Sequence, residues 1–280
     1  MQNRSTFRRW IFASLALLSV NPVLARDDSD SKRRVREEIH KTYPLDAHGS
    51  IRLDNVNGDV TITTWDKESV KLDVVKRAET REDLERVKID VSSKPGRLEI
   101  RTKYPRHEDD DHDNNNTTAV EYTLVVPKGV ALDKVSTVNG AVELSGLEGS
   151  VKVSTVNGRI NASSLRGDAK LSAVNGKVTA RFASLGRKQD VSVSAVNGAV
   201  TVLLPDDAGA SVDISTVNGT ITNEFGPARI EGHRASLKTN IGEGEAAVRL
   251  STVNGPIALR KLAREDTDTE GKEHRGSKTE

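Results

Sequence analysis

Residues suited to metal chemistry lie together in one polar stretch, PRHEDDDHDNNNTT, at 105–118. Carboxylates and imidazoles bind divalent cations, and the weak candidate ligands are His107, Asp109, Asp111 and His112. However, HEDDDH has one residue too many between its histidines for the helical HExxH zinc motif, and the stretch lacks the glycine-punctuated spacing of a calcium loop. We predict a solvated acidic insertion here and no metal site.

Paired carboxylates would be the chemistry of a polysaccharide-cleaving enzyme, which needs two of them facing one sugar bond. Four acids in the second half of the chain are candidates: Glu143, Asp168, Asp190 and Asp213. They stand at different offsets from the repeat described below, so we do not expect them to form a pair. We predict no catalytic residue, and a carbohydrate-active β-helix enzyme is the alternative.

Other signatures of catalysis or cofactor binding are missing from the sequence. It contains no GxSxG elbow, no P-loop and no cysteine. GEGEAA at 242–247 has the letters of the GxGxxA dinucleotide fingerprint, but strand-like VRLSTVNG follows where that motif needs a helix. Phe182 and Phe225 are the only aromatic residues after position 130, few for a sugar-binding platform. We predict no cofactor.

All the candidate acids sit within or beside a repeat of the letters VNG. Its asparagines are separated by 82, 18, 18, 22, 21 and 36 residues. The last interval is about two periods, and LKTNIGEG at 237–244 is interpreted as a degenerate copy between them. The turn residues are Asn57, Asn139, Asn157, Asn175, Asn197, Asn218, Asn254, Gly58, Gly140, Gly158, Gly176, Gly198, Gly219 and Gly255.

The same apolar pattern surrounds each of these asparagines. An aliphatic residue stands four positions before and another three after, valine directly precedes it, and serine stands three before in the six later copies. Asn-Gly tolerates positive φ and, between alternating aliphatic residues, is a strong hairpin signal. Serial hairpins and a β-solenoid both fit, but only stacked coils explain why serine and valine recur, since identical side chains then form ladders about 4.8 Å apart.

The pattern therefore predicts an all-β fold, a single-stranded β-solenoid with coils of 18–22 residues and a short helix in its N-terminal part. A stacked asparagine can bond its neighbours through its amide, so these asparagines are expected to be structural rather than catalytic.

Longer stretches carry a resemblance to a known family. EYTLVVPKGVALDKVSTVNGAVELSGLEG, PDDAGASVDISTVNGTITNEFG, GEGEAAVRLSTVNGPIALRK and, nearer the N-terminus, TTWDKESVKLDVVKRA look like the bacterial "putative adhesin" family of β-strand-repeat domains of unknown function. The resemblance covers roughly residues 45–262. It implies a secreted or envelope β-solenoid with a binding or adhesive role, and it supplies no catalytic residues to carry over.

The chain is expected to divide into five parts. Residues 1–25 have the basic start, apolar run WIFASLALLSV and small residues of a secretory signal peptide cleaved near Ala25. A charged flexible segment (26–44), an N-terminal β region (45–130, with the insertion 105–118), the VNG solenoid (131–262) and a disordered charged tail (263–280) follow. ETREDLERV at 79–87 is the helix candidate, with Thr80 as its cap.

Charge and composition restrict the classes of function that are expected. Removal of residues 1–25 takes away Arg4, Arg8 and Arg9, so 39 of the 42 basic residues face 41 acidic ones, and a nucleic-acid partner is not expected. No apolar run after the signal peptide is long enough to anchor the chain in a membrane. We predict a non-enzymatic periplasmic or secreted protein that binds an unknown envelope or cell-surface partner, protein or polysaccharide; an envelope-stress sensor is a further alternative.

Overall fold

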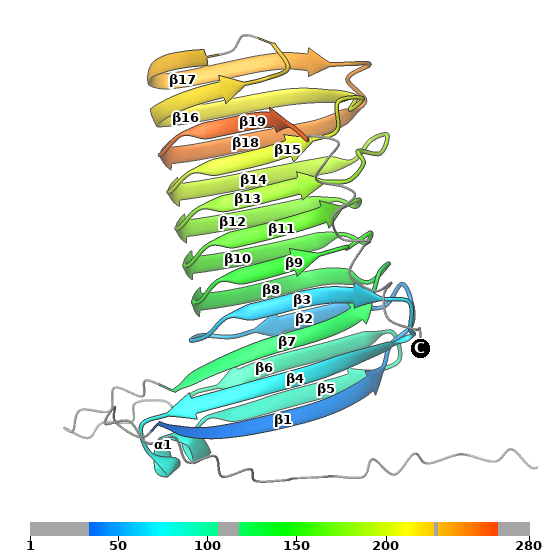
Figure 1. Ribbon diagram of the computed structural model, residues 1–280, viewed down its shortest axis with the longest axis vertical. Coiled ribbons are helices and arrows are strands. Elements are labelled where there is room, and N and C mark those ends of the chain that lie inside the picture. The colour runs from blue at the N-terminus through cyan, green and yellow to red at the C-terminus, as the bar shows by residue number, and fades with distance from the viewer. Residues whose placement is uncertain (1–33, 106–117, 227–228, 263–280) are drawn as a thin grey trace, which may run out of the picture. The chain divides into compact units, whose positions relative to one another are not determined.

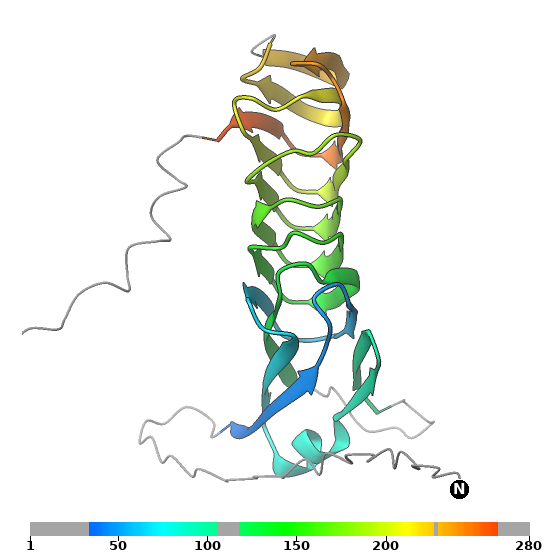
Figure 2. The same ribbon diagram turned by 90° about the vertical axis from the view of Figure 1, so that its right-hand side faces the viewer.

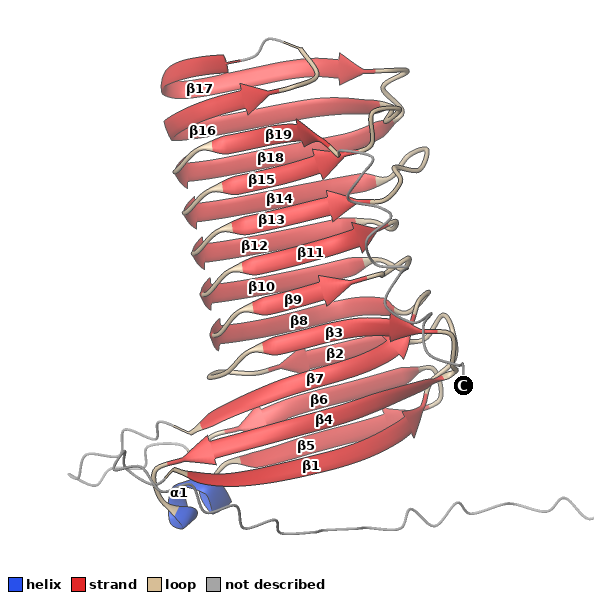
Figure 3. Cartoon of the chain, in the orientation of Figure 1, coloured by secondary structure: helices blue, strands red, loops and turns tan. Residues whose placement is uncertain are grey.

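The computed structural model describes residues 34–105, 118–226 and 229–262. The predicted signal peptide, the weak metal candidates His107, Asp109, Asp111 and His112, and the predicted tail all lie outside the described residues. The described chain is almost entirely β-strand, as expected, with nineteen strands and one short helix (Figures 1 and 3).

The elements before the VNG array proper are the following: β1 (Val35–Pro44), β2 (Ser50–Asp54), β3 (Val60–Trp65), β4 (Ser69–Ala78), α1 (Arg81–Arg86), β5 (Lys88–Lys94), β6 (Arg97–Lys103) and β7 (Ala119–Pro127). The helix begins as predicted, because the Thr80 hydroxyl accepts a hydrogen bond from the N–H of Asp83 at 3.1 Å and so caps the first turn. Leu84 in the helix and Val87 at its end are both buried.

The VNG array comprises β8 (Ala131–Asn139), β9 (Val142–Ser145), β10 (Val151–Asn157), β11 (Ile160–Leu165), β12 (Ala169–Asn175), β13 (Val178–Phe182), β14 (Asp190–Asn197), β15 (Val200–Leu204), β16 (Ala210–Asn223), β17 (Arg229–Ile241), β18 (Ala246–Asn254) and β19 (Ile257–Lys261).

Successive copies of the repeat stack on each other as coils, which confirms the expected solenoid-like architecture. The strand before each VNG pairs in parallel with the equivalent strand of the next copy, so that Asn139 faces Asn157 and Asn157 faces Asn175. The strand after each VNG does the same, β9 with β11 and β11 with β13. From β8 to β15, each strand pairs with its counterpart in an adjacent coil, 18 to 22 residues away in sequence, and not with its own neighbour across the turn. This part of the array is therefore not a series of hairpins.

The stacking order departs from the sequence order at the C-terminal end. Strand β14 pairs with β18, and β18 pairs with β16, so Asn254 lies between Asn197 and Asn218. The prediction that residues 237–244 are a further coil is wrong. Residues 237–241 belong to β17, which runs antiparallel to β16 and closes the stack, and the chain then returns to insert β18 and β19 beneath β16 (Figure 1).

The N-terminal end extends the same stack. Strands β2 and β3 carry Asn57 at their corner and pair in parallel with β8 and β9, and β6 and β7 form the next layer. Strand β4 then adds antiparallel to β7, and β5 antiparallel to β6. The prediction of a flexible segment at 26–44 is wrong for residues 35–44, because they form β1, which is paired along its length with β4.

The core is an apolar column between the two faces of the stack. Figure 2 shows the strands of the two faces on either side of the stack. In each coil, the aliphatic residues four before and three after the asparagine point inward, for example Val153 and Ile160, which are 3% and 1% exposed. A fully buried aliphatic side chain contributes about 1.5–3 kcal/mol. Since alternate residues of a strand face opposite sides, the intervening residues point outward and are free to form a surface.

Candidate functional site

The asparagines form one ladder of side-chain hydrogen bonds at the corner of the coils. Each Nδ2 donates to the Oδ1 of the asparagine in the adjacent coil, at 2.8–2.9 Å, in the order Asn218, Asn254, Asn197, Asn175, Asn157, Asn139 and Asn57. His233 closes one end, with its Nδ1 2.9 Å from Oδ1 of Asn218. The amides are thus engaged with one another along the corner.

The glycines serve close packing more than unusual backbone angles. The expectation that Asn-Gly supplies positive φ holds only at Gly58 (124°) and Gly255 (157°), and no asparagine of the ladder has positive φ. A Cβ on Gly158 would lie 1.9 Å from the carbonyl oxygen of Gly140 in the adjacent coil. The other ladder glycines after Gly58 meet the glycine carbonyl of the adjacent coil at 1.9–2.1 Å in the same way. Glycine is therefore required because the corner backbones touch.

The outward residues just before the corner form two rows along the stack. Serine stands three before the asparagine, as in Ser154 and Ser172, and valine one before, as in Val156 and Val174. Five of these valines are 37–41% exposed, namely Val138, Val156, Val174, Val196 and Val253.

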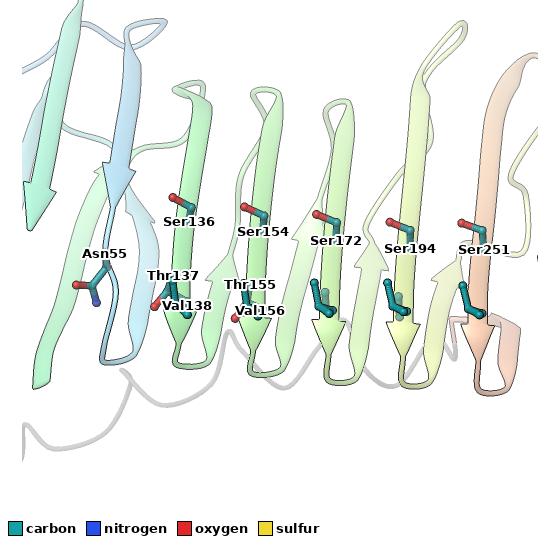
Figure 4. Close-up of a pocket in the computed structure, with 15 residues that line it drawn as sticks. Asn55, Ser136, Thr137, Val138, Ser154, Thr155, Val156, Ser172, Ser194 and Ser251 are labelled. Carbon is teal, nitrogen blue, oxygen red and sulfur yellow. The ribbon is translucent and has the colours of Figure 1, made fainter. Parts of the chain in front are cut away.

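The two rows line a trough of about 500 Å³ that runs across five coils, with serine hydroxyls and valine side chains side by side (Figure 4). It is a regular, largely apolar surface that remains open to solvent.

A largely basic row runs beside the trough, at the position two residues before the serines of the trough and at the equivalent position of β2. Its members are Arg52, Lys134, Lys152, Lys170 and Arg249, interrupted by Ser192. Lys134 bonds Asp54 at 2.6 Å, and Arg249 bonds Asp190 at 2.7 Å. No ion pair among the described residues includes Lys152 or Lys170, which face each other on neighbouring strands and are exposed.

Asp54 anchors the lower end of this row. Partial burial opposes its ionisation, but hydrogen bonds from Lys134, Ser136 and Arg52 outweigh that effect and lower the pKa of Asp54 from 3.8 to about 2. Asp54 is therefore a fixed negative charge that pairs with both Arg52 and Lys134, whereas the central Lys152 and Lys170 have no such partner among the described residues.

The predicted acids fall into separate environments, with one exception. Glu143 pairs with Arg159 on the face after the corner, and Asp213 pairs with Lys238. The expectation that no two acids line up is wrong for Asp168 and Asp190. Both stand seven residues before their asparagine, and Asp168 Oδ1 accepts the backbone N–H of Asp190 at 2.9 Å.

Metal binding finds no support in the described part of the chain, which holds no group of three histidine or acidic side chains arranged for an ion. Within the same residues, no helix is long and apolar enough to cross a membrane.

Comparison with known proteins places the repeat in a family. Residues 130–260 match the family model Toastrack DUF4097. This segment is a Toastrack DUF4097 domain. The Toastrack domain thus contains the trough from Ser136 to Val253 and all of the asparagine ladder except Asn57. No curated protein matches the chain.

Several solved structures are similar to this chain at low sequence identity. The "putative cell adhesion protein" of Clostridium sporogenes ATCC 15579 is 14% identical, with a TM-score of 0.47 over 81% of this chain and 100% of the other. A "putative adhesin" of Bacteroides fragilis NCTC 9343 is 13% identical, with a TM-score of 0.37 over 80% and 97%. A "putative lipid binding protein" of Parabacteroides distasonis ATCC 8503 is 12% identical, with a TM-score of 0.28 over 81% and 97%.

The trough was not identified from the sequence, although the signal for it was present. The inward positions four and two before the asparagine imply that the serine three before it and the valine one before it point outward. Valines that recur at this outward position form an exposed apolar row, and this row distinguishes the surface.

Proposed function

We propose that this chain is an exported, non-enzymatic protein that binds an envelope or cell-surface partner along the trough. The observation that carries the proposal is the row of five exposed valines in register beside the serine row. Monomeric proteins keep contiguous exposed apolar surface small, and larger patches mark interaction sites. Here an aliphatic residue recurs at an outward position in five coils of the stack.

The construction of the stack suits binding by many weak contacts. Parallel pairing on both sides and the asparagine ladder hold the rows at a fixed spacing, so little conformational entropy is lost when a partner docks. The hydroxyls of Ser154 and Ser172 lie beside the valines and can bond a polar partner that also covers the apolar row. A rigid, repetitive surface of this kind serves an extended partner better than a compact one.

The test is capture of the partner by the purified protein from whole cells and envelope preparations, with the double variant V156Q/V174Q. These changes keep side chains of moderate size on exposed strand positions while they remove the apolar row at the centre of the trough. T179Q/T201Q, on the strands after the corner, is the matched control. We expect V156Q/V174Q to lose most of the captured material and the control to retain it. Equal capture by both variants, or none by the native protein, would contradict the proposal.

Export itself rests on residues 1–25, which lie outside the described part of the structure. Their basic start, apolar run and small residues at 23–25 support translocation with cleavage near Ala25. The test is cell fractionation with mass measurement of the exported form, for which an N-terminus at Arg26 is expected. An uncleaved cytoplasmic product would contradict this part of the proposal.

Cleavage of a polysaccharide is a second candidate function, and the pair Asp168 and Asp190 is the observation that favours it. The carboxylate of Asp190 is also bound by Arg249 at 2.7 Å, which suits a structural ion pair better than an acid that must gain and lose protons. Turnover on a panel of polysaccharides that is abolished by D168N would favour this function over simple binding.

A further inference from the structure

Lys152 and Lys170 stand next to each other, and neither forms an ion pair with an acid in the part of the chain that the structure describes. Lys152 and Lys170 are direct partners on the parallel strands β10 and β12, and both are exposed. Like charges directly opposite on neighbouring strands destabilise a sheet. Asp168, two residues before Lys170, accepts a backbone N–H from Asp190, and Asp133, at the bulge of β8 opposite Lys152, lies 3.8 Å from Arg97. An arrangement that costs stability at the centre of a candidate binding surface suggests that an anion neutralises it when bound.

The lysines are aligned with the trough. Lys152 precedes Ser154 by two residues and Val156 by four, and Lys170 has the same relation to Ser172 and Val174. Because alternate residues of a strand share a face, lysine, serine and valine lie in line across the outer face of each of these two coils. Across these two coils, the valines therefore form one side of the trough and the serines the other, and the lysines lie just beyond the serines.

We propose that the trough binds a linear acidic glycan that lies along the stack; this inference rests on the function proposed above. The carbon–hydrogen faces of successive sugars would cover the valines, their hydroxyls would bond the serines, and their carboxylates would reach Lys152 and Lys170. Neighbouring coils are about 4.8 Å apart, which is close to the length of one sugar unit in an extended chain, so that each sugar meets an equivalent set of side chains.

A lipid fits the same surface less well. The trough is open and its valines are 37–41% exposed, so an acyl chain lying in it would keep one side in water. It would also cover the serine hydroxyls without bonding them, and burial of unbonded polar groups is unfavourable. A hydroxyl-bearing polymer satisfies both rows.

The experiment measures binding of polygalacturonate, and of its methyl-esterified form, to the purified protein by calorimetry. The ester keeps the sugar backbone and removes its charge. We expect the native protein to bind the acid form, to bind the ester weakly, and to lose about three- to tenfold in affinity for the acid form as K152Q/K170Q, since each exposed ion pair adds a modest amount. K94Q/K177Q removes two exposed lysines outside the trough and is expected to bind as the native protein does.

Other outcomes would overturn the inference. An acidic glycan would be excluded as the occupant if the native protein bound the acid and the ester with equal affinity, or if K152Q/K170Q and K94Q/K177Q lost the same affinity for the acid form. Binding only to phosphatidylglycerol vesicles would exclude it as well. Capture from envelopes that still depends on Val156 and Val174 would then leave the proposed function standing, with a partner of different chemistry. If the native protein neither bound polygalacturonate nor captured material from envelopes through Val156 and Val174, the proposed function would be contradicted as well.

Discussion

Asn157 donates a hydrogen bond from Nδ2 to Oδ1 of Asn139 at 2.8 Å, although 18 residues separate the two in sequence. The same bond, in the same direction, links every adjacent pair of asparagines in the stack. Aligned amides polarise one another, so each bond in such a chain strengthens its neighbours. The corner is therefore a continuous element of the fold rather than a set of separate turns.

Removal of an asparagine from the middle of the ladder should destabilise the protein. Asn157 both donates to Asn139 and accepts from Asn175, so N157A loses two hydrogen bonds. At about 0.5–1.5 kcal/mol for each bond, we expect the free energy of unfolding to fall by about 1–3 kcal/mol. Urea unfolding followed by circular dichroism measures the change.

The matched control for this variant is N161A. Asn161 lies four residues further on in the same coil and takes no part in the ladder. We expect this substitution to change the free energy of unfolding by less than about 0.5 kcal/mol. If both variants lost the same stability, the ladder would contribute nothing beyond the ordinary cost of an asparagine substitution in a strand.

The regular part of this fold was predictable because its period is visible in the letters. Asn139, Asn157 and Asn175 repeat at one interval with the same neighbours, and the stack places them in contact as expected. The order of Asn218 and Asn254 was not predictable, since an interval of two periods is the same whether the intervening strand continues the stack or returns antiparallel. The alternating buried residues Ala235 and Leu237 suit either arrangement.

Strand β1 was missed for a different reason. It is an edge strand, and only Val35, Ile39 and Tyr43 along it are even partly covered. Its sequence VREEIHKTYP therefore lacks the alternation that marks a half-buried strand, and charged edge residues are the means by which sheets avoid pairing with other chains. A charged segment of this kind has the composition of a linker, and only its pairing with β4 shows that it is a strand.

The closeness of the corner backbones predicts a severe effect of a single methyl group. In G158A, the new Cβ would lie 1.9 Å from the Gly140 carbonyl oxygen, a backbone atom that cannot move without disturbing the adjacent coil. We expect a loss of about 3 kcal/mol or more in the free energy of unfolding.

The control is G186A, where a Cβ would meet only Oε1 of Gln189, at 3.6 Å. That variant should unfold at nearly the same urea concentration as the native protein. If G158A does not fold well enough for equilibrium unfolding, soluble yield and circular dichroism of the two variants give the comparison. Native-like behaviour of G158A would show that the corners are not tightly packed.

Stability should depend on the ionisation of Asp54. Its pKa is about 2 in the folded protein and 3.8 ordinarily, so it stabilises the fold above pH 3.8 and this contribution is lost as the pH falls toward 2. D54N should therefore lower the free energy of unfolding by about 1–2 kcal/mol near pH 7, and the difference from the native protein should shrink at low pH. Urea unfolding of both proteins across this pH range measures the difference in the free energy of unfolding.

The control is D207N, in the exposed turn before β16, which should have the same free energy of unfolding as the native protein. If D54N remained less stable than the native protein at low pH, the loss would come from packing and not from charge.

The ladder also predicts that the Asn-Gly pairs resist chemical damage. In a flexible chain, the glycine nitrogen attacks Cγ of the preceding asparagine, ammonia leaves, and water opens the resulting succinimide to aspartate or isoaspartate. Here the N–H of Gly158 donates to the carbonyl oxygen of Asn175 at 3.1 Å, and the side-chain amide of Asn157 is bonded on both sides. The attacking nitrogen and the group it must reach are therefore both held in place.

During prolonged incubation at mildly alkaline pH, we expect peptide mass spectrometry to find isoaspartate in the urea-unfolded chain and little in the folded protein. Equal rates in the two states would show that the hydrogen bonds of the corner do not restrain the reaction.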